Sequence, residues 1–107
     1  MTAPAPILEV YEVGSTTVVG FGGRDVLDDV NIVACRDEII ALIEHEKCDV
    51  LAFDLTGVTL LPSGLLGLLA SARQHGAAIH LYNPSPDIRE VLETTHLDKV
   101  MEVHFVM

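Results

Sequence analysis

The serine hydroxyl of Ser63 is the side chain whose position in this sequence offers the clearest chemistry. It follows an apolar segment at 49–55 and comes directly before a leucine-rich run, so we predict it at the start of a helix. Free backbone N–H groups at such a start lie at the positive end of the helix dipole. The hydroxyl could cap the helix, or it could carry a phosphate that those amides would accommodate. Local physics leaves both roles open.

Asp54 is the second candidate, because it ends the predicted strand over 49–55. The carboxyl ends of strands in an open α/β sheet are where ligands and partners commonly bind. The same carboxylate could instead accept hydrogen bonds from nearby loop amides. The sequence does not choose between these two roles.

Two short motifs are better explained by structural roles than by ligand binding. Gly20-x-Gly22-Gly23 lacks the following lysine and helix of a phosphate-binding loop, so we interpret it as a turn at a strand end. The pair His45-x-x-Cys48 offers two zinc ligands at best, and Cys48 begins an apolar segment typical of a core.

The remaining histidines lie on different predicted elements. A Ser-His-Asp triad could be drawn from Ser63, Asp54 and one histidine, but no G-x-S-x-G motif supports it. We therefore expect no catalytic residues, no metal site and no cofactor, and we predict that the protein is not an enzyme. The histidines concerned are His75, His80, His96 and His104.

Composition narrows the possible partners. Half of the 107 residues are hydrophobic, and six Lys and Arg against sixteen Asp and Glu give a formal charge of −10. Nucleic acid and anionic lipid both require a basic surface, so we exclude them as partners. Cys35 and Cys48 resemble the free thiols of a cytosolic protein, and no signal peptide is visible. The most apolar segment, 60–72, is interrupted by proline and glycine, so we expect a cytoplasmic protein without membrane insertion.

Hydrophobic periodicity predicts a loose lead-in at 1–6 and a single domain over 7–107. Its first half contains a strand at 7–13, hairpin-paired with one at 16–21, and then a helix capped by Asp28 or Asp29 that ends near Lys47. Ile32, Cys35, Ile39 and Leu42 or Ile43 form the apolar stripe of that helix, and Glu38 lies on its polar side.

The second half begins with the strand at 49–55, which we predict to be central and parallel. A loop leads to a helix capped by Ser63 and stopped at Gly76. The remaining elements are a strand at 77–82, a helix that starts at Ser85-Pro86 and a strand at 100–106. The order β-β-α-β-α-β-α-β indicates an α/β fold with a mixed, mostly parallel sheet, an antiparallel entry hairpin and helices packed on it.

Three stretches of this sequence resemble the STAS domain family, the bacterial anti-sigma factor antagonists. Residues 26–28, Val-Leu-Asp, are similar to the family's Gly-x-Leu-Asp before the first helix. Residues 54–67, Asp-Leu-Thr-Gly-Val-Thr-Leu-Leu-Pro-Ser-Gly-Leu-Leu-Gly, are similar without gaps to the family's Asp-Leu-Ser-Gly-Val-Thr-Phe-Ile-Asp-Ser-Ser-Gly-Leu-Gly. Residues 85–98 resemble its closing helix and Thr-Gly-Leu-Asp turn. The resemblance covers nearly the whole chain and agrees with the predicted element order.

The resemblance implies a protein-binding regulatory module in a partner-switching pathway. Its partner would be an anti-sigma factor, often a serine kinase, and phosphorylation at the position of Ser63 would switch binding off. Pro62 replaces the family's aspartate, which leaves open a module that binds without being phosphorylated. The alternatives are a scaffold that assembles with other STAS proteins and a sensor of a nucleotide or lipid. The expected partner-binding residues are Asp28, Asp54, Thr56, Thr59, Pro62, Ser63, Gly64, Leu65 and Leu66.

Overall fold

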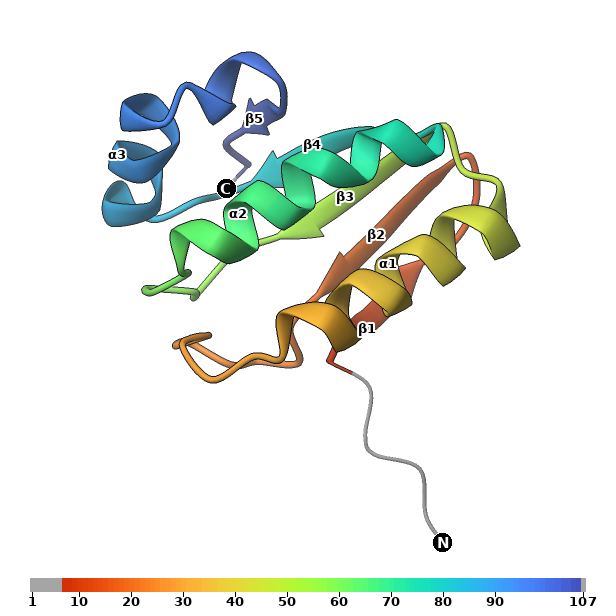
Figure 1. Cartoon of the computed structure of the whole chain (residues 1–107), viewed down its shortest axis with the longest axis horizontal. Helices are drawn as coiled ribbons and strands as arrows, with labels where there is room; N and C mark the ends of the chain where they lie inside the picture. Colours follow the sequence, from red (N-terminus) through yellow and green to blue (C-terminus); the bar gives the residue numbers. More distant parts are fainter. Residues whose placement is uncertain (1–6, 107) are drawn as a thin grey trace, which may run out of the picture.

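The β-branched and apolar segments of the chain assemble into one five-stranded mixed sheet in the computed structural model, which describes residues 7–106 (Figure 1). The expected lead-in at 1–6 lies outside the described residues. Within them, the element order is the predicted one. The strands are β1 (Glu9–Glu12), β2 (Thr16–Gly20), β3 (Val50–Asp54), β4 (Ala78–Tyr82) and β5 (Glu102–His104).

The strands lie side by side in chain order, β1-β2-β3-β4-β5. β1 pairs antiparallel with β2, which confirms the entry hairpin, and the other three pairings are parallel. β3 is the central strand, and its Leu51, Ala52 and Phe53 are buried, as an unbroken apolar run predicts. β1 forms one edge and β5 the other.

Helices cover one face of this sheet. α1 (Ile32–Glu46) and α2 (Ser63–Ser71) both lie in front of it in Figure 1, and α3 (Pro86–Thr94) lies beside the β5 end. Two short 3-10 helices, η1 (Ala72–His75) and η2 (Leu97–Lys99), follow α2 and α3. Buried side chains of α1, α2, α3 and the strands form one hydrophobic core. α1 and α2 cover the same face, and none of the helices in residues 7–106 covers the other face of the sheet.

The start of α1 differs from the expectation. Asp28 and Asp29 do not cap it; Asn31 does, and its Oδ1 accepts a hydrogen bond of 3.0 Å from the Ala34 amide. The helix begins later than expected because Leu27 is buried and its amide donates to the Leu60 carbonyl. These contacts hold the segment before α1 in a non-helical conformation. Asn and Asp are equally good caps, so the sequence could not separate them.

Two residues of α1 also differ in burial from the expectation. Cys35, Ile39 and Ile43 are buried as predicted, but Ile32 is exposed. Glu38 is half-buried rather than fully solvated, and its Oε1 accepts a 3.0 Å hydrogen bond from the Leu8 amide. This carboxylate therefore ties α1 to the segment that leads into β1.

Ser63 is the first residue of α2 and not its cap. Pro62 holds the capping position with φ of −60°, and no side chain makes a capping hydrogen bond there. A residue whose own backbone is already helical does not direct its hydroxyl at the amides of the next turn, as an N-cap does. The start of α3 is as predicted: the Ser85 hydroxyl accepts from the Ile88 amide at 3.3 Å, and Pro86 is the first helical residue.

Candidate functional site

Ser63 and the following Gly64 are exposed at the start of α2, where a partner could reach them. Leu65 and Leu66 are not: they are 1% and 0% exposed, and both belong to the hydrophobic core. Their burial contradicts the expectation that both leucines contact a partner. The two side chains turn toward the sheet, because the helix needs an apolar face and Leu65, Leu66 and Leu69 supply it.

Backbone hydrogen bonds join the loop after β2 to the loop after β3. The Thr59 and Leu60 amides donate to the Asp25 carbonyl at 2.7 and 3.2 Å, and the Leu27 amide donates to the Leu60 carbonyl at 3.0 Å. Val26 and Leu60 form a parallel bridge between the two loops. The Thr59 hydroxyl adds a bond of 3.1 Å to the Asp25 carbonyl. Two segments far apart in the sequence thus form one continuous edge next to Ser63.

Exposed apolar side chains gather along this edge. Val26, Ile32 and Leu60 are 38%, 43% and 47% exposed. Ile32 connects the edge to α2, because its Cδ1 lies 3.4 Å from where a Cβ on Gly64 would stand. We call Val26, Ile32, Leu60, Ser63 and Gly64 the Ser63 surface. The exposure of its apolar members could not be predicted from the sequence, because a single Val, Ile or Leu there cannot be distinguished from a core residue.

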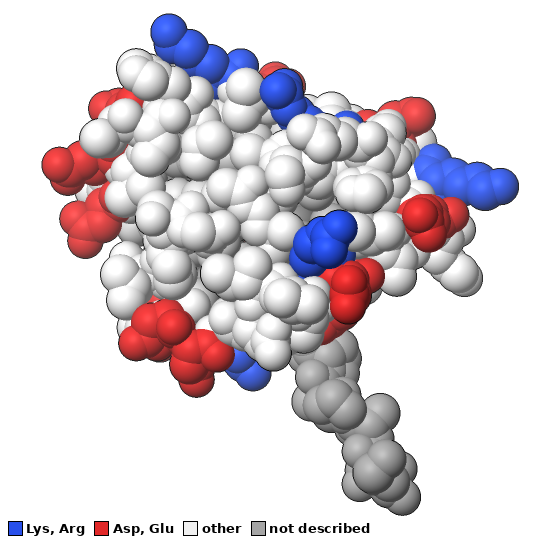
Figure 2. All heavy atoms as spheres, viewed as in Figure 1, with Lys and Arg blue, Asp and Glu red and all other residues white. Residues whose placement is uncertain are grey.

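Charge is distributed unevenly around the Ser63 surface. α2 contains no charged residue, and Figure 2 shows an uncharged band over it. Acidic side chains gather over the β2–α1 loop, at the lower left of that view. Asp25, Asp28 and Asp29 in this loop are exposed. The Ser63 surface is therefore an uncharged area with an acidic border.

Asp54 has a structural role at the carboxyl end of β3. Its Oδ1 accepts hydrogen bonds from the Thr56 amide at 3.0 Å and from the Thr56 hydroxyl at 2.6 Å. The Asn83 side chain donates to the Thr56 hydroxyl oxygen at 2.9 Å. This chain of bonds links the ends of β3 and β4, so Asp54 shapes the loop that leads to Ser63.

The other motifs have structural roles as well. Gly22 and Gly23 have φ of 66° and 80°, which fits the turn interpretation. Cys35 and Cys48 are buried free thiols. Burial, with a smaller contribution from Glu38, raises the pKa of the Cys35 thiol to about 11, so it stays protonated at neutral pH. Cys48 is thus a core residue, as predicted.

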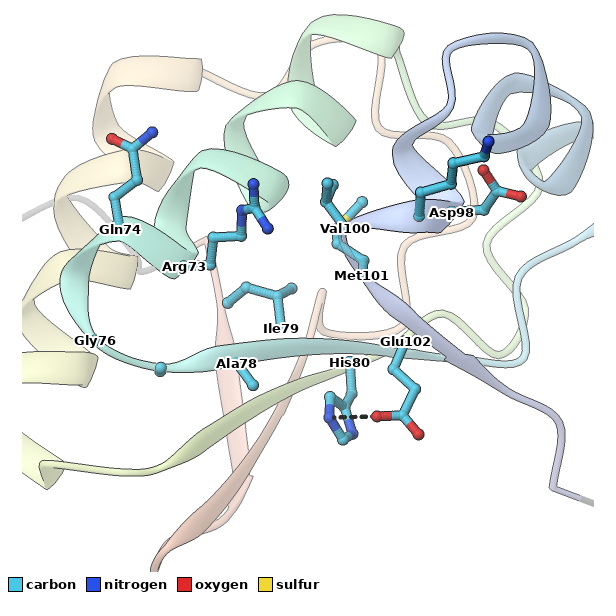
Figure 3. Close-up of a pocket in the computed structure, with 12 residues that line it drawn as sticks. Arg73, Gln74, Gly76, Ala78, Ile79, His80, Asp98, Val100, Met101 and Glu102 are labelled. Carbon is cyan, nitrogen blue, oxygen red and sulfur yellow. Dashed lines mark ion pairs between the residues drawn. The ribbon is translucent and has the colours of Figure 1, made fainter.

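A cleft of about 870 Å³ opens beside β4, where β5 pairs only with His80 to Tyr82 and leaves the start of β4 uncovered (Figure 3). Arg73 and Lys99 line it from η1 and η2, with Ile79 and Met101 at its base. None of its lining residues belongs to the Ser63 surface. It is therefore not a ligand pocket beside Ser63.

The sequence of this domain matches the model of a known family. The family model described as STAS domain matches residues 8–106. The chain belongs to the STAS domain family. A comparison with the sequences of curated proteins gives no significant match.

Solved structures show the same fold for this STAS domain. The anti-sigma-factor antagonist (STAS) domain protein from Planctomyces limnophilus superposes with a TM-score of 0.79 at 22% identity, covering 94% of this chain and 91% of that one. The unphosphorylated anti-sigma factor antagonist SpoIIAA gives 0.74 at 20% identity, with 90% and 86% covered. The phosphorylated Bacillus cell fate determinant SpoIIAA gives 0.63 at 19%, with 90% and 89% covered. None of the helices in residues 7–106 has the length and apolar character to cross a membrane.

Proposed function

We propose that this STAS domain is a protein-binding regulatory module of the anti-sigma factor antagonist kind, with no enzymatic activity of its own. Its partner would be an anti-sigma factor, of the serine kinase type, in a partner-switching pathway that controls transcription. The observation that carries this proposal is the exposed apolar group Val26, Ile32 and Leu60 beside the exposed Ser63. Exposed apolar groups with a polar border are typical of protein interaction sites. The similar structures of anti-sigma factor antagonists support the kind of partner.

The contact area we propose is centred on the Ser63 surface. Asp28, Thr56 and Thr59 would form its polar border, and Pro62 would fix the approach to the helix. Asp54 would act through Thr56, whose amide and hydroxyl it holds. Leu65 and Leu66 would support the surface from within the core and make no contact themselves.

Leu60→Asp and Ile32→Asp test the proposal directly. Each places a charge in the proposed contact, and we expect affinity for the partner to fall at least tenfold, as for central apolar contacts in other interfaces. The folded state should persist, because both side chains are partly solvated. Biolayer interferometry measures the affinity of each variant for the purified anti-sigma factors of the source organism. Circular dichroism checks that each variant is folded.

Val13→Asp is the matched control, because Val13 is also exposed but lies between β1 and β2, at the opposite end of β2 from the Ser63 surface. It should bind as the unmodified protein does. Equal affinity of all four proteins would refute the Ser63 surface as the contact. Complexes formed only with other STAS proteins would support the scaffold alternative instead.

Association should also depend on salt. The exposed Asp25, Asp28 and Asp29 border the contact, and exposed charges are screened beyond about 8 Å at physiological ionic strength. We expect the association rate constant to fall as sodium chloride rises, because the acidic border steers a basic partner. Stopped-flow measurements should show a weaker dependence for Asp28→Asn than for Glu90→Gln on α3. A rate independent of salt would contradict this steering.

A further inference from the structure

Three side chains with metal-ligating atoms meet on the face of the sheet that has no helix layer. His80 lies in β4, and Glu102 and His104 lie in β5. The parallel register places His80 opposite Glu102 and Tyr82 opposite His104. Side chains alternate along a strand, so His80 points away from the buried Ile79 and Leu81 (Figure 3). Glu102 and His104, two residues apart, share that same face.

The side chains are in contact. His80 Nδ1 lies 3.2 Å from His104 Nε2, and the other ring nitrogen of His80 lies 3.1 Å from a Glu102 carboxylate oxygen. His104 Nε2 lies 3.5 Å from the second oxygen of that carboxylate. Tyr82 stacks on the His104 ring with centroids 4.8 Å apart and an interplanar angle of 19°. The two imidazoles are thus partly buried and held in position by neighbouring rings.

These spacings suit a single metal ion. One donor atom from each of the three residues can be chosen so that all lie within 4.8 Å of one another. Ligands of tetrahedral zinc lie about 3.3 Å apart, because Zn–N and Zn–O bonds are about 2.0–2.2 Å long. The His80–His104 separation of 3.2 Å already matches this value. A small rotation of the exposed Glu102 side chain would bring its oxygen to the same ion.

We propose that His80, Glu102 and His104 form a binding site for a divalent transition-metal ion, with zinc as its expected occupant. Two imidazoles and one carboxylate favour zinc and related ions, whereas magnesium and calcium prefer oxygen ligands alone. Three protein ligands leave a fourth position open to water. The site is independent of the Ser63 surface, with which it shares no residue.

A bound ion would attach β5 to β4 through side chains. β5 has only three residues and pairs on one side, so its attachment to the sheet rests on few backbone hydrogen bonds. Anything that binds the folded state alone raises its stability. The metal site would therefore control how firmly the last strand is held.

The test uses tag-free protein stripped with a chelator and titrated with zinc chloride at pH 7.5. We expect one zinc ion per chain by isothermal titration calorimetry. With zinc at a hundred times the dissociation constant, the midpoint of thermal unfolding should rise by roughly 10 °C. Affinity should be lower in acidic buffer, because metal binding requires neutral imidazoles and therefore releases protons. Absence of zinc binding at millimolar concentration would overturn the proposal.

His80→Gln and His104→Gln should each weaken zinc binding by more than about a hundredfold. Losing a residue that only orients a metal ligand costs at most about a hundredfold, so a larger loss indicates a direct ligand. His75→Gln is the matched control, because His75 is exposed on η1 and does not belong to the cluster of His80, Glu102 and His104. It should bind zinc normally. Unchanged affinity in His80→Gln and His104→Gln would refute the assignment.

A measurement on the unmodified protein covers the case in which a variant does not fold. The imidazole signals of all five histidines can be followed by NMR as zinc is added. The site predicts that His80 and His104 shift together with one-to-one stoichiometry, while His45, His75 and His96 stay in place. Shifts confined to the other three histidines would exclude it.

Discussion

Leu66→Ala should lower the free energy of unfolding by about 2–5 kcal/mol, the usual cost of removing a buried leucine side chain. Leu66 is fully buried where α2 packs on the sheet. Truncation removes its apolar contacts and leaves a cavity that the surrounding core fills only in part. Domains of this size have about 5–15 kcal/mol of stability in total, so the variant loses a large share of it. Urea unfolding followed by circular dichroism gives the difference.

Leu60→Ala is the matched control for this prediction. It is the same chemical change three residues before Ser63, at a side chain that is nearly half exposed. Its free energy of unfolding should change by no more than about 0.5 kcal/mol, while its affinity for the partner should fall. If Leu60→Ala unfolds more easily than Leu66→Ala, the assignment of Leu66 to the core and Leu60 to the surface is wrong.

The order of the elements could be predicted from the sequence because each signal is local. The unbroken apolar run at 50–53 indicates a central parallel strand, and Ser85 followed by Pro86 indicates a helix start. Both are confirmed. Local signals fail where several residues offer equal chemistry, as Asp28, Asp29 and Asn31 do for a helix cap.

The Ser63 surface could be predicted only in part, because it depends on contacts between distant segments. Ser63 itself was found from its place before a leucine-rich run. Val26 and Leu60 were not, since they meet only when the loops after β2 and β3 hydrogen-bond to each other, and Ile32 joins the surface only through its approach to Gly64. Leu65 was misplaced for a related reason: in a helix as apolar as α2, composition does not say which leucines face the sheet.

The cluster of histidines also depends on contacts between segments that are distant in the sequence. Spacing along the chain predicts different elements for His80 and His104, and the structure places them on separate strands. The strands are neighbours, however, and their register brings both rings to Glu102. Register is a property of pairing between strands and has no local signal in β4 or β5 alone. This is why the sequence offered no metal site.

Ser63→Asp should weaken partner binding by about 2–4 kcal/mol, or roughly thirty- to a thousandfold in dissociation constant. The change places a negative charge at the centre of an uncharged area that already has an acidic border. A partner that fits the neutral serine would then have to bury an unpaired charge at the centre of the contact. The domain itself should remain folded, because a carboxylate at a helix start interacts favourably with the dipole.

Two control variants distinguish an effect of charge at Ser63 from an effect of net charge. Ser63→Ala should bind normally with almost unchanged stability, because the Ser63 hydroxyl makes no capping bond that could be lost. Ser85→Asp adds the same charge at the start of α3, keeps a good cap there and should leave affinity unchanged. Equal weakening by Ser63→Asp and Ser85→Asp would show that net charge alone is responsible.

We propose that phosphorylation of Ser63 would be the regulated form of this change. The exposed hydroxyl is accessible, and SpoIIAA, which has the same fold, has been solved in phosphorylated form. Pro62 stands where the resemblance to the family implies an aspartate, so a carboxylate is missing next to the acceptor, and the proline fixes the backbone that a kinase must bind. We therefore expect a kinase that does not depend on that carboxylate to add one phosphate. Intact mass before and after treatment with the purified kinase-type anti-sigma factors measures it, and Ser63→Ala should gain none. If the unmodified protein also gains no phosphate, the domain binds its partner without this switch, and regulation must come from elsewhere in the complex.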